Sequence, residues 1–139
     1  MDETLPLVLC LDDDWRILEI LSKILSRLPL EHVVTGSPLE AIELAQRLRP
    51  RLLILDLMLP EMSGWEALDK MRDGTQRDDL RVIVLTAKDA QYERLVAANV
   101  ARVDLFLTKP FDAGELAHHI LRLLDLPASE AWPASQGET

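Results

Sequence analysis

The chain alternates short apolar runs with segments of helical periodicity, five times over. The apolar runs end near Leu11, Thr35, Leu55, Leu85 and Leu107. After the first run, apolar residues recur at spacings of three and four from Ile17 to Leu28, which is typical of an amphipathic helix. The first, third and fourth runs are apolar almost throughout, as in strands that helices cover on both faces. The pattern predicts a doubly wound α/β domain with a parallel five-stranded sheet.

Capping signals mark where the predicted helices begin. Ser37 and Glu40 form a capping box with Pro38 at the first helical position, and residues 63–66 and 112–115 have a similar form. Asp14 is placed to cap a helix that begins at Trp15. Trp15 and Trp65 both stand at helix starts, and we expect both to pack against the domain.

Composition excludes several classes of function. The 139 residues leave room for one domain. A net charge of −9 argues against sequence-independent binding to nucleic acid and against binding to an anionic membrane. No apolar stretch approaches the roughly 18 residues of a membrane span. The single cysteine, Cys10, excludes an internal disulfide and a Cys-rich zinc site. Because the first three residues also lack the positive flank of a signal peptide, we expect a cytoplasmic protein.

The character of the chain changes near Leu126. Residues 126–139 are rich in Pro, Ala and Ser, which predicts a C-terminal tail or linker after a folded domain at residues 1–125. Trp132 lies in that stretch, and the sequence offers no role for it.

Polar residues close four of the predicted strands. With right-handed crossovers and a strand order of 2-1-3-4-5, the first and third strands are neighbours where the strand order reverses, and ligands bind there in such sheets. We therefore expect these polar residues to meet at one edge. They are Asp12 and Asp13 after the first strand, Asp56 after the third, Thr86 and Ala87 at the end of the fourth, and Lys109 at the end of the fifth.

The acidic residues at this edge suit a divalent cation. Three neighbouring carboxylates repel one another, which raises the pKa of at least one of them unless a cation compensates. Mg²⁺ prefers oxygen ligands, and Mn²⁺ is an alternative. We expect the metal ligands to be Asp12, Asp13, Asp56 and the backbone carbonyl of Met58.

The same edge suits a phosphoryl group. An Asp side chain can act as a nucleophile and form an acyl phosphate, and Asp56 is the candidate. The metal would bind one phosphoryl oxygen, Lys109 a second, and the Thr86 hydroxyl with a nearby backbone N–H the third. Ala87, next to Thr86, leaves access for the phosphoryl donor.

These motifs resemble those of bacterial two-component response-regulator receiver domains. The four matching segments are residues 8–14, 55–60 together with 62–64, 85–87 and 106–111, each at the end of a predicted strand and at intervals that suit the family. The resemblance covers about residues 5 to 125. It implies a CheY-like, flavodoxin-like (βα)5 sandwich and a phospho-accepting signalling domain rather than an enzyme, with only self-phosphorylation and autodephosphorylation chemistry.

The resemblance also implies partners and a switch. Asp56 would accept phosphate from the phosphohistidine of a sensor histidine kinase or a histidine phosphotransfer protein. The Lys109–Pro110 bond would be cis. Thr86 would move toward the phosphoryl group and Phe106 would rotate inward. This would reshape the surface formed by the fourth helix, fifth strand and last helix, where a homodimer would form. The downstream effector is not specified.

Two stretches depart from the family pattern, and two other functions stay open. Arg102-Val103-Asp104 stands where the family often has Gly-Ala-Asp. Arg51 follows Pro50, where the family usually has Asp. The first alternative is an Mg²⁺-dependent aspartyl-phosphate phosphatase of the haloacid-dehalogenase type. It would need Asp-x-Asp-Gly-Thr at the first strand, whereas Trp15 and Arg16 follow the aspartates here. The second is a receiver-like scaffold that binds partners without phosphorylation.

Overall fold

The computed structural model describes residues 4–60, 62–75, 79–87 and 103–127. The elements in chain order are β1 (Leu7–Leu11), α1 (Trp15–Leu25), β2 (Glu31–Thr35), α2 (Pro38–Leu48), β3 (Leu52–Leu55), α3 (Gly64–Thr75), β4 (Arg81–Ala87), β5 (Leu105–Lys109) and α5 (Ala113–Leu123). The fourth predicted helix falls on residues 88–102, outside the described residues, as do Trp132 and residues 128–139 of the predicted tail.

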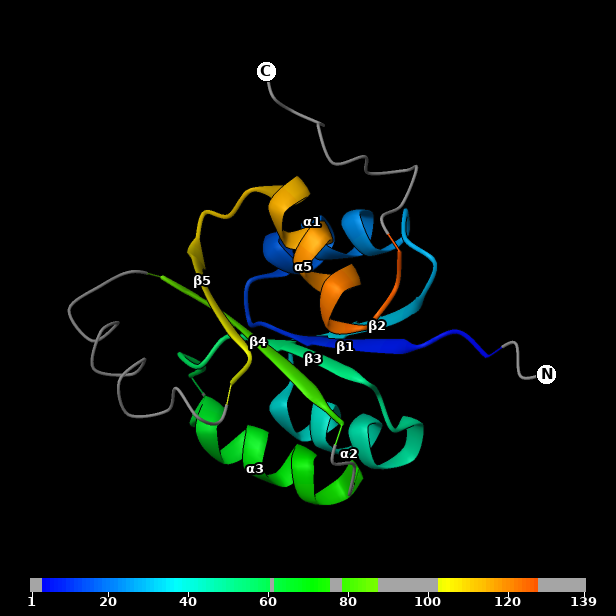
Figure 1. The fold of residues 1–139 in the computed structure, drawn as a ribbon. Coiled ribbons are helices and arrows are strands. Elements are labelled where there is room, and N and C mark those ends of the chain that lie inside the picture. The colour runs from blue at the N-terminus through cyan, green and yellow to red at the C-terminus, as the bar shows by residue number, and fades with distance from the viewer. Residues whose placement is uncertain (1–3, 61, 76–78, 88–102, 128–139) are drawn as a thin grey trace.

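All five strands are parallel and lie in the order β2-β1-β3-β4-β5 (Figure 1), which confirms the predicted sheet. Leu11, the last residue of β1, pairs with Thr35 of β2 and with Leu55 of β3. The carboxyl ends of these three strands are therefore level, so the residues that follow them emerge at one edge of the sheet.

Helices cover both faces of the sheet: α1 and α5 lie on one side, and α2 and α3 on the other (Figure 1). Successive side chains of a strand point to opposite faces, so β1 contributes to both cores. Val8 and Cys10 pack toward α1 and α5, whereas Leu9 and Leu11 pack toward α2 and α3. All four are buried, which explains why this strand is apolar throughout. Burial raises the pKa of the Cys10 thiol, so this residue is a small hydrophobe of the core.

The predicted N-cap bonds of Asp14, Ser37 and Asp112 are present. The return bond of the predicted Ser37–Glu40 capping box is replaced, because the Ser37 N–H donates to Thr35 Oγ1 at 3.1 Å and the Glu40 carboxylate accepts a hydrogen bond from Thr35. The Asp14 carboxylate accepts a hydrogen bond from the Arg16 backbone N–H at 3.0 Å. Ser37 Oγ accepts one from the Glu40 N–H at 3.2 Å, and the Asp112 carboxylate accepts one from Glu115 at 2.8 Å. These bonds satisfy N–H groups that have no partner within their own helix, and they fix where each helix begins.

The prediction for Trp15 was wrong. Its side chain is 68% exposed, because Trp15 precedes the apolar face of α1, which begins at Ile17 and Leu18. Trp65 is half-buried and packs against the core beneath α2 and α3, as predicted. Among the helices described, none has the length and apolar character that crossing a membrane requires.

Candidate functional site

Three carboxylates meet at the carboxyl edge of the sheet. Asp12 and Asp13 follow β1, and Asp56 follows β3, which lies beside it. One oxygen from each of the three lies within 4.8 Å of the others. Asp12 is 1% exposed and Asp56 is 6% exposed, whereas Asp13 faces solvent. The structure thus brings together the three acidic residues that the sequence predicts.

Lys109, the last residue of β5, reaches across to two of these carboxylates. Its Nζ lies 2.7 Å from Asp12 Oδ2 and 2.8 Å from Asp56 Oδ2. The Lys109–Pro110 peptide bond is cis. The other oxygens are held by the main chain: the Asp14 N–H donates to Asp12 Oδ1 at 2.9 Å, and the Met58 N–H donates to Asp56 Oδ1 at 2.8 Å. Both buried carboxylates are therefore fixed at each oxygen.

Burial and charge shift the pKa values of two of these groups in the same direction. Burial raises the pKa of Asp12, with a smaller contribution from the neighbouring Asp56, and the hydrogen bonds from Lys109 and Asp14 offset only part of the effect. For Lys109, burial alone would lower the pKa, but its contacts with Asp12 and Asp56 outweigh burial and raise that pKa. The ammonium group therefore stays charged at neutral pH.

Thr86 and Ala87 end β4 beside this cluster. Thr86 is 1% exposed, and its hydroxyl is buried without a hydrogen-bond partner among the described residues. An unpaired buried hydroxyl is costly, so this group is a candidate to bind a ligand. Ala87 is exposed and pairs in register with Lys109. Phe106, on β5, is half-buried and packs against the core beneath α2 and α3.

A hollow of about 440 Å³ adjoins the acidic cluster, and the sequence did not predict it. Asp13 forms one side of it, and the β3–α3 loop with the start of α3 forms the rest. The loop residues are Leu57, Met58, Leu59, Pro60 and Ser63, with Trp65 from the helix. Met58 is 42% exposed, so an apolar side chain borders the entrance to the carboxylates.

The donor set fits a small divalent cation. Three carboxylate oxygens within 4.8 Å of one another are hard ligands, which suit Mg²⁺ better than a soft metal. Burial is the main reason why the pKa of Asp12 is raised, and a cation beside this carboxylate would stabilise its charged form.

Residues 8–121 match the family model of the response regulator receiver domain. The chain belongs to this family. Receiver domains are signalling modules of two-component systems, and the family assignment does not favour a phosphatase of the haloacid-dehalogenase type or a scaffold that works without phosphorylation.

Curated relatives agree with this assignment. The receiver domain is 38% identical over 117 residues to the response regulator MprA of Mycobacterium leprae (strain TN), covering 84% of this chain and 50% of the relative. It is also 38% identical to the probable transcriptional regulatory protein TcrX of Mycobacterium tuberculosis (strain ATCC 25618 / H37Rv). That match covers 84% of this chain and 49% of the relative. The chain thus spans about half the length of the curated relatives it matches.

Solved structures agree on the fold. A CheY-like receiver domain from Methanospirillum hungatei JF-1 superposes with a TM-score of 0.76 at 26% identity, covering 88% of this chain and 95% of the other. The signal receiver domain of a putative Luxo repressor protein from Vibrio parahaemolyticus gives 0.74 at 29% identity, covering 86% and 90%. The receiver domain therefore has the CheY-like fold that the sequence predicts.

Proposed function

We propose that Asp56 is the phosphoryl acceptor of this receiver domain, and that the donor is the phosphohistidine of a sensor histidine kinase or a histidine phosphotransfer protein. The observation that carries the proposal is that each oxygen of the Asp56 carboxylate accepts a hydrogen bond. The Met58 N–H binds one carboxylate oxygen and the Lys109 ammonium binds the other. Phosphoryl transfer needs mainly a positioned nucleophile and neutralised charge, and this arrangement provides both.

In the proposed reaction, an oxygen of the Asp56 carboxylate attacks the phosphorus of the phosphohistidine. A P–O bond forms as the P–N bond breaks, and the imidazole nitrogen keeps the electron pair and takes up a proton. Asp12, Asp13, Asp56 and the backbone carbonyl of Met58 would hold Mg²⁺, which supplies positive charge to a phosphoryl oxygen when bound. Lys109 would bind a second oxygen, and the Thr86 hydroxyl with a nearby backbone N–H the third. Exposed Ala87 would leave room for the donor.

The proposed chemistry is limited to gaining and losing this phosphoryl group, in the cytoplasm. We assign the receiver domain to residues 1–125 and the tail or linker to residues 126–139. The effector is unassigned, and the proposed homodimer surface includes residues 88–102, outside the described part of the chain.

Acetyl phosphate with Mg²⁺ tests the acceptor. We expect one phosphoryl group per chain in intact-protein mass spectrometry and none in Asp56→Asn, because the amide oxygen is a poor nucleophile. Asp125→Asn, at an exposed acid beyond the last helix, is the control and should be labelled normally. A label that persists in Asp56→Asn would rule out this acceptor. Multiple turnovers of p-nitrophenyl phosphate would instead favour the phosphatase.

Beryllofluoride, which mimics the phosphoryl group, tests the switch. Thr86 has a buried hydroxyl without a partner in the described part of the chain, so a new acceptor at Asp56 should draw it inward. We expect NMR shifts at Thr86 and Phe106 as well as at Asp56. Thr86→Val should keep the shifts at Asp56 and lose those at Phe106. Shifts confined to the acidic cluster in the unmodified chain would contradict the switch.

A further inference from the structure

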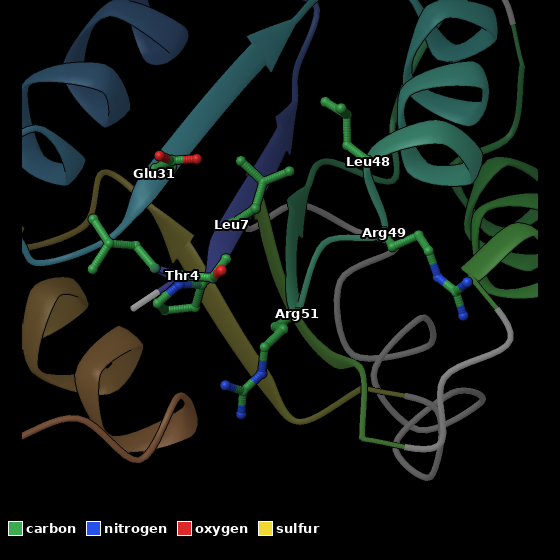
Figure 2. A pocket seen from close by; sticks show the side chains of 8 residues that line it. Thr4, Leu7, Glu31, Leu48, Arg49 and Arg51 are labelled. Atoms are coloured by element: carbon green, nitrogen blue, oxygen red, sulfur yellow. The ribbon is translucent and has the colours of Figure 1, made fainter. Parts of the chain in front are cut away.

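A second pocket lies at the opposite edge of the sheet from Asp56. It has a volume of about 510 Å³ and opens at the amino ends of β1, β2 and β3 (Figure 2). Leu5, Leu7 and Leu48 supply apolar walls, and Thr4 and Pro6 complete the side formed by the chain before β1. Glu31, Arg49 and Arg51 supply the charges. It shares no residue with the acidic cluster.

The two guanidinium groups are the unusual feature of this pocket. Both arginines line the pocket in a chain with a net charge of −9, and Figure 2 shows their side chains extending in different directions. Arg51 Nε is buried and has no hydrogen-bond partner among the described residues. A buried guanidinium N–H without a partner is costly, which indicates that a ligand completes its hydrogen bonding.

The backbone at Arg49 gives an independent indication. Arg49 ends α2 with a φ of 54°, in the left-handed region that favours glycine at the end of a helix. Glycine would adopt this conformation without steric cost, whereas arginine does not. A strained residue of this kind supports a functional role, and Arg49 is one of the residues that line the pocket.

We propose that this pocket binds a carboxylate with an apolar body. The planar guanidinium group matches a carboxylate with two parallel hydrogen bonds, and the leucine walls would hold the apolar part. Glu31 adds a negative charge on the same pocket, which disfavours a doubly charged phosphate more than a singly charged carboxylate. Because the pocket and Asp56 lie at opposite edges, binding does not require phosphorylation. The carboxylate belongs either to a small molecule or to an acidic residue of a partner peptide.

NMR titration of the full chain tests the site with two probes, hexanoate and the peptide acetyl-Glu-Leu-Leu-amide. We expect saturable shifts at Leu7, Glu31 and Arg51, and none at Asp56. Tighter binding of the peptide would support the site and assign the carboxylate to a partner protein. Hexanoate binding at least as tightly would support it and assign a small molecule.

Four variants separate binding from folding. Arg49→Gly and Arg51→Gln should each weaken binding about tenfold, the usual effect of losing a hydrogen bond to a charged group. Arg49→Gly also relieves the left-handed backbone, and its melting temperature is measured beside the titration so that a loss of binding is distinguished from a loss of folding. Glu31→Gln should tighten binding, because it removes a like charge. Arg47→Gln, on the same helix but outside the pocket, is the control and should change nothing.

Two results would overturn the proposal. The first is that the shifts do not saturate, or that they persist unchanged in both Arg49→Gly and Arg51→Gln. The second is that the shifts appear only at Asp56 and Lys109, which would place the carboxylate at the acidic cluster instead.

Discussion

Lys109 places one ammonium group between two carboxylates, and the main chain holds the other oxygen of each. Asp12 and Asp56 therefore have little freedom to rotate, because turning either side chain would break contacts at both of its oxygens. Asp13 is exposed at the same edge. An incoming group would meet two fixed carboxylates and one adaptable one, so little reorganisation would precede the reaction.

The buried charge of Asp12 should reduce stability at neutral pH in the absence of metal. Its folded-state pKa is raised, so the folded protein binds more protons than the unfolded protein between the two pKa values, and stability falls as pH rises through that window. Asp12→Asn in EDTA should raise the melting temperature at pH 7 by roughly 3 °C, or about 1 kcal/mol. The gain should shrink as pH falls through the raised pKa. A gain that is independent of pH would contradict this explanation.

Single residues differ in how well the sequence predicts them. Asp12 and Asp56 follow buried apolar runs, and parallel strands must present their carboxyl ends together, so their meeting is predictable. Trp15 was not predictable in the same way, because a residue at the very start of a helix can lie outside the apolar stripe. Arg49 was harder still, since its left-handed φ follows from how α2 ends.

At the scale of elements, the loop between β3 and α3 depends on a close approach at Gly64. A Cβ added there would lie 2.4 Å from Leu57 Cα and 3.0 Å from the carbonyl oxygen of Asp56. The Gly64 N–H also donates to the Leu57 carbonyl at 3.1 Å. The absence of a side chain at Gly64 therefore sets where the backbone of the acceptor lies.

Gly64→Ala should displace this loop. The new methyl group would meet backbone atoms, which cannot move aside as a side chain can, and overpacking of this kind costs about 1–3 kcal/mol. We expect lower stability in urea unfolding and slower labelling of Asp56 by acetyl phosphate. Gly36→Ala is the matched control, because its nearest neighbour, the Asp12 carbonyl oxygen, would lie 3.4 Å away. Equal stability and equal labelling rates in the two variants would contradict this role for Gly64.

The sequence predicted the elements well where local chemistry decides them. The Ser37 and Asp112 caps fix helix starts through bonds within four residues, so a short motif carries the information. The pocket of Figure 2 is different, because it combines residues near Leu7, Glu31 and Arg49 that lie far apart in the chain. No short sequence motif contains these residues together. They meet because the amino ends of neighbouring parallel strands lie at the same edge of the sheet.

For the molecule as a whole, metal binding should be coupled to folding. Because the carboxylates gather only in the folded chain, Mg²⁺ at about 100 times its Kd should stabilise it by about 2.7 kcal/mol, which is roughly 8 °C in melting temperature. EDTA should reverse the shift. Asp13→Asn removes an exposed ligand with little effect on folding, so it should keep the metal-free melting temperature and lose most of the shift. An equal shift in that variant would exclude Asp13 from the metal site.

The two edges of the sheet carry fixed charges of opposite sign. Aspartates gather beyond the carboxyl ends of the strands, and Arg49 and Arg51 stand at the amino ends. A five-residue strand spans roughly 16 Å, which is about twice the Debye length in physiological salt. These groups therefore give the described part of the molecule a charge separation along its strands, which Lys109 and Glu31 reduce but do not reverse. A positively charged partner would orient the molecule during approach so that its acidic edge faces the partner. Added salt would weaken this orienting effect.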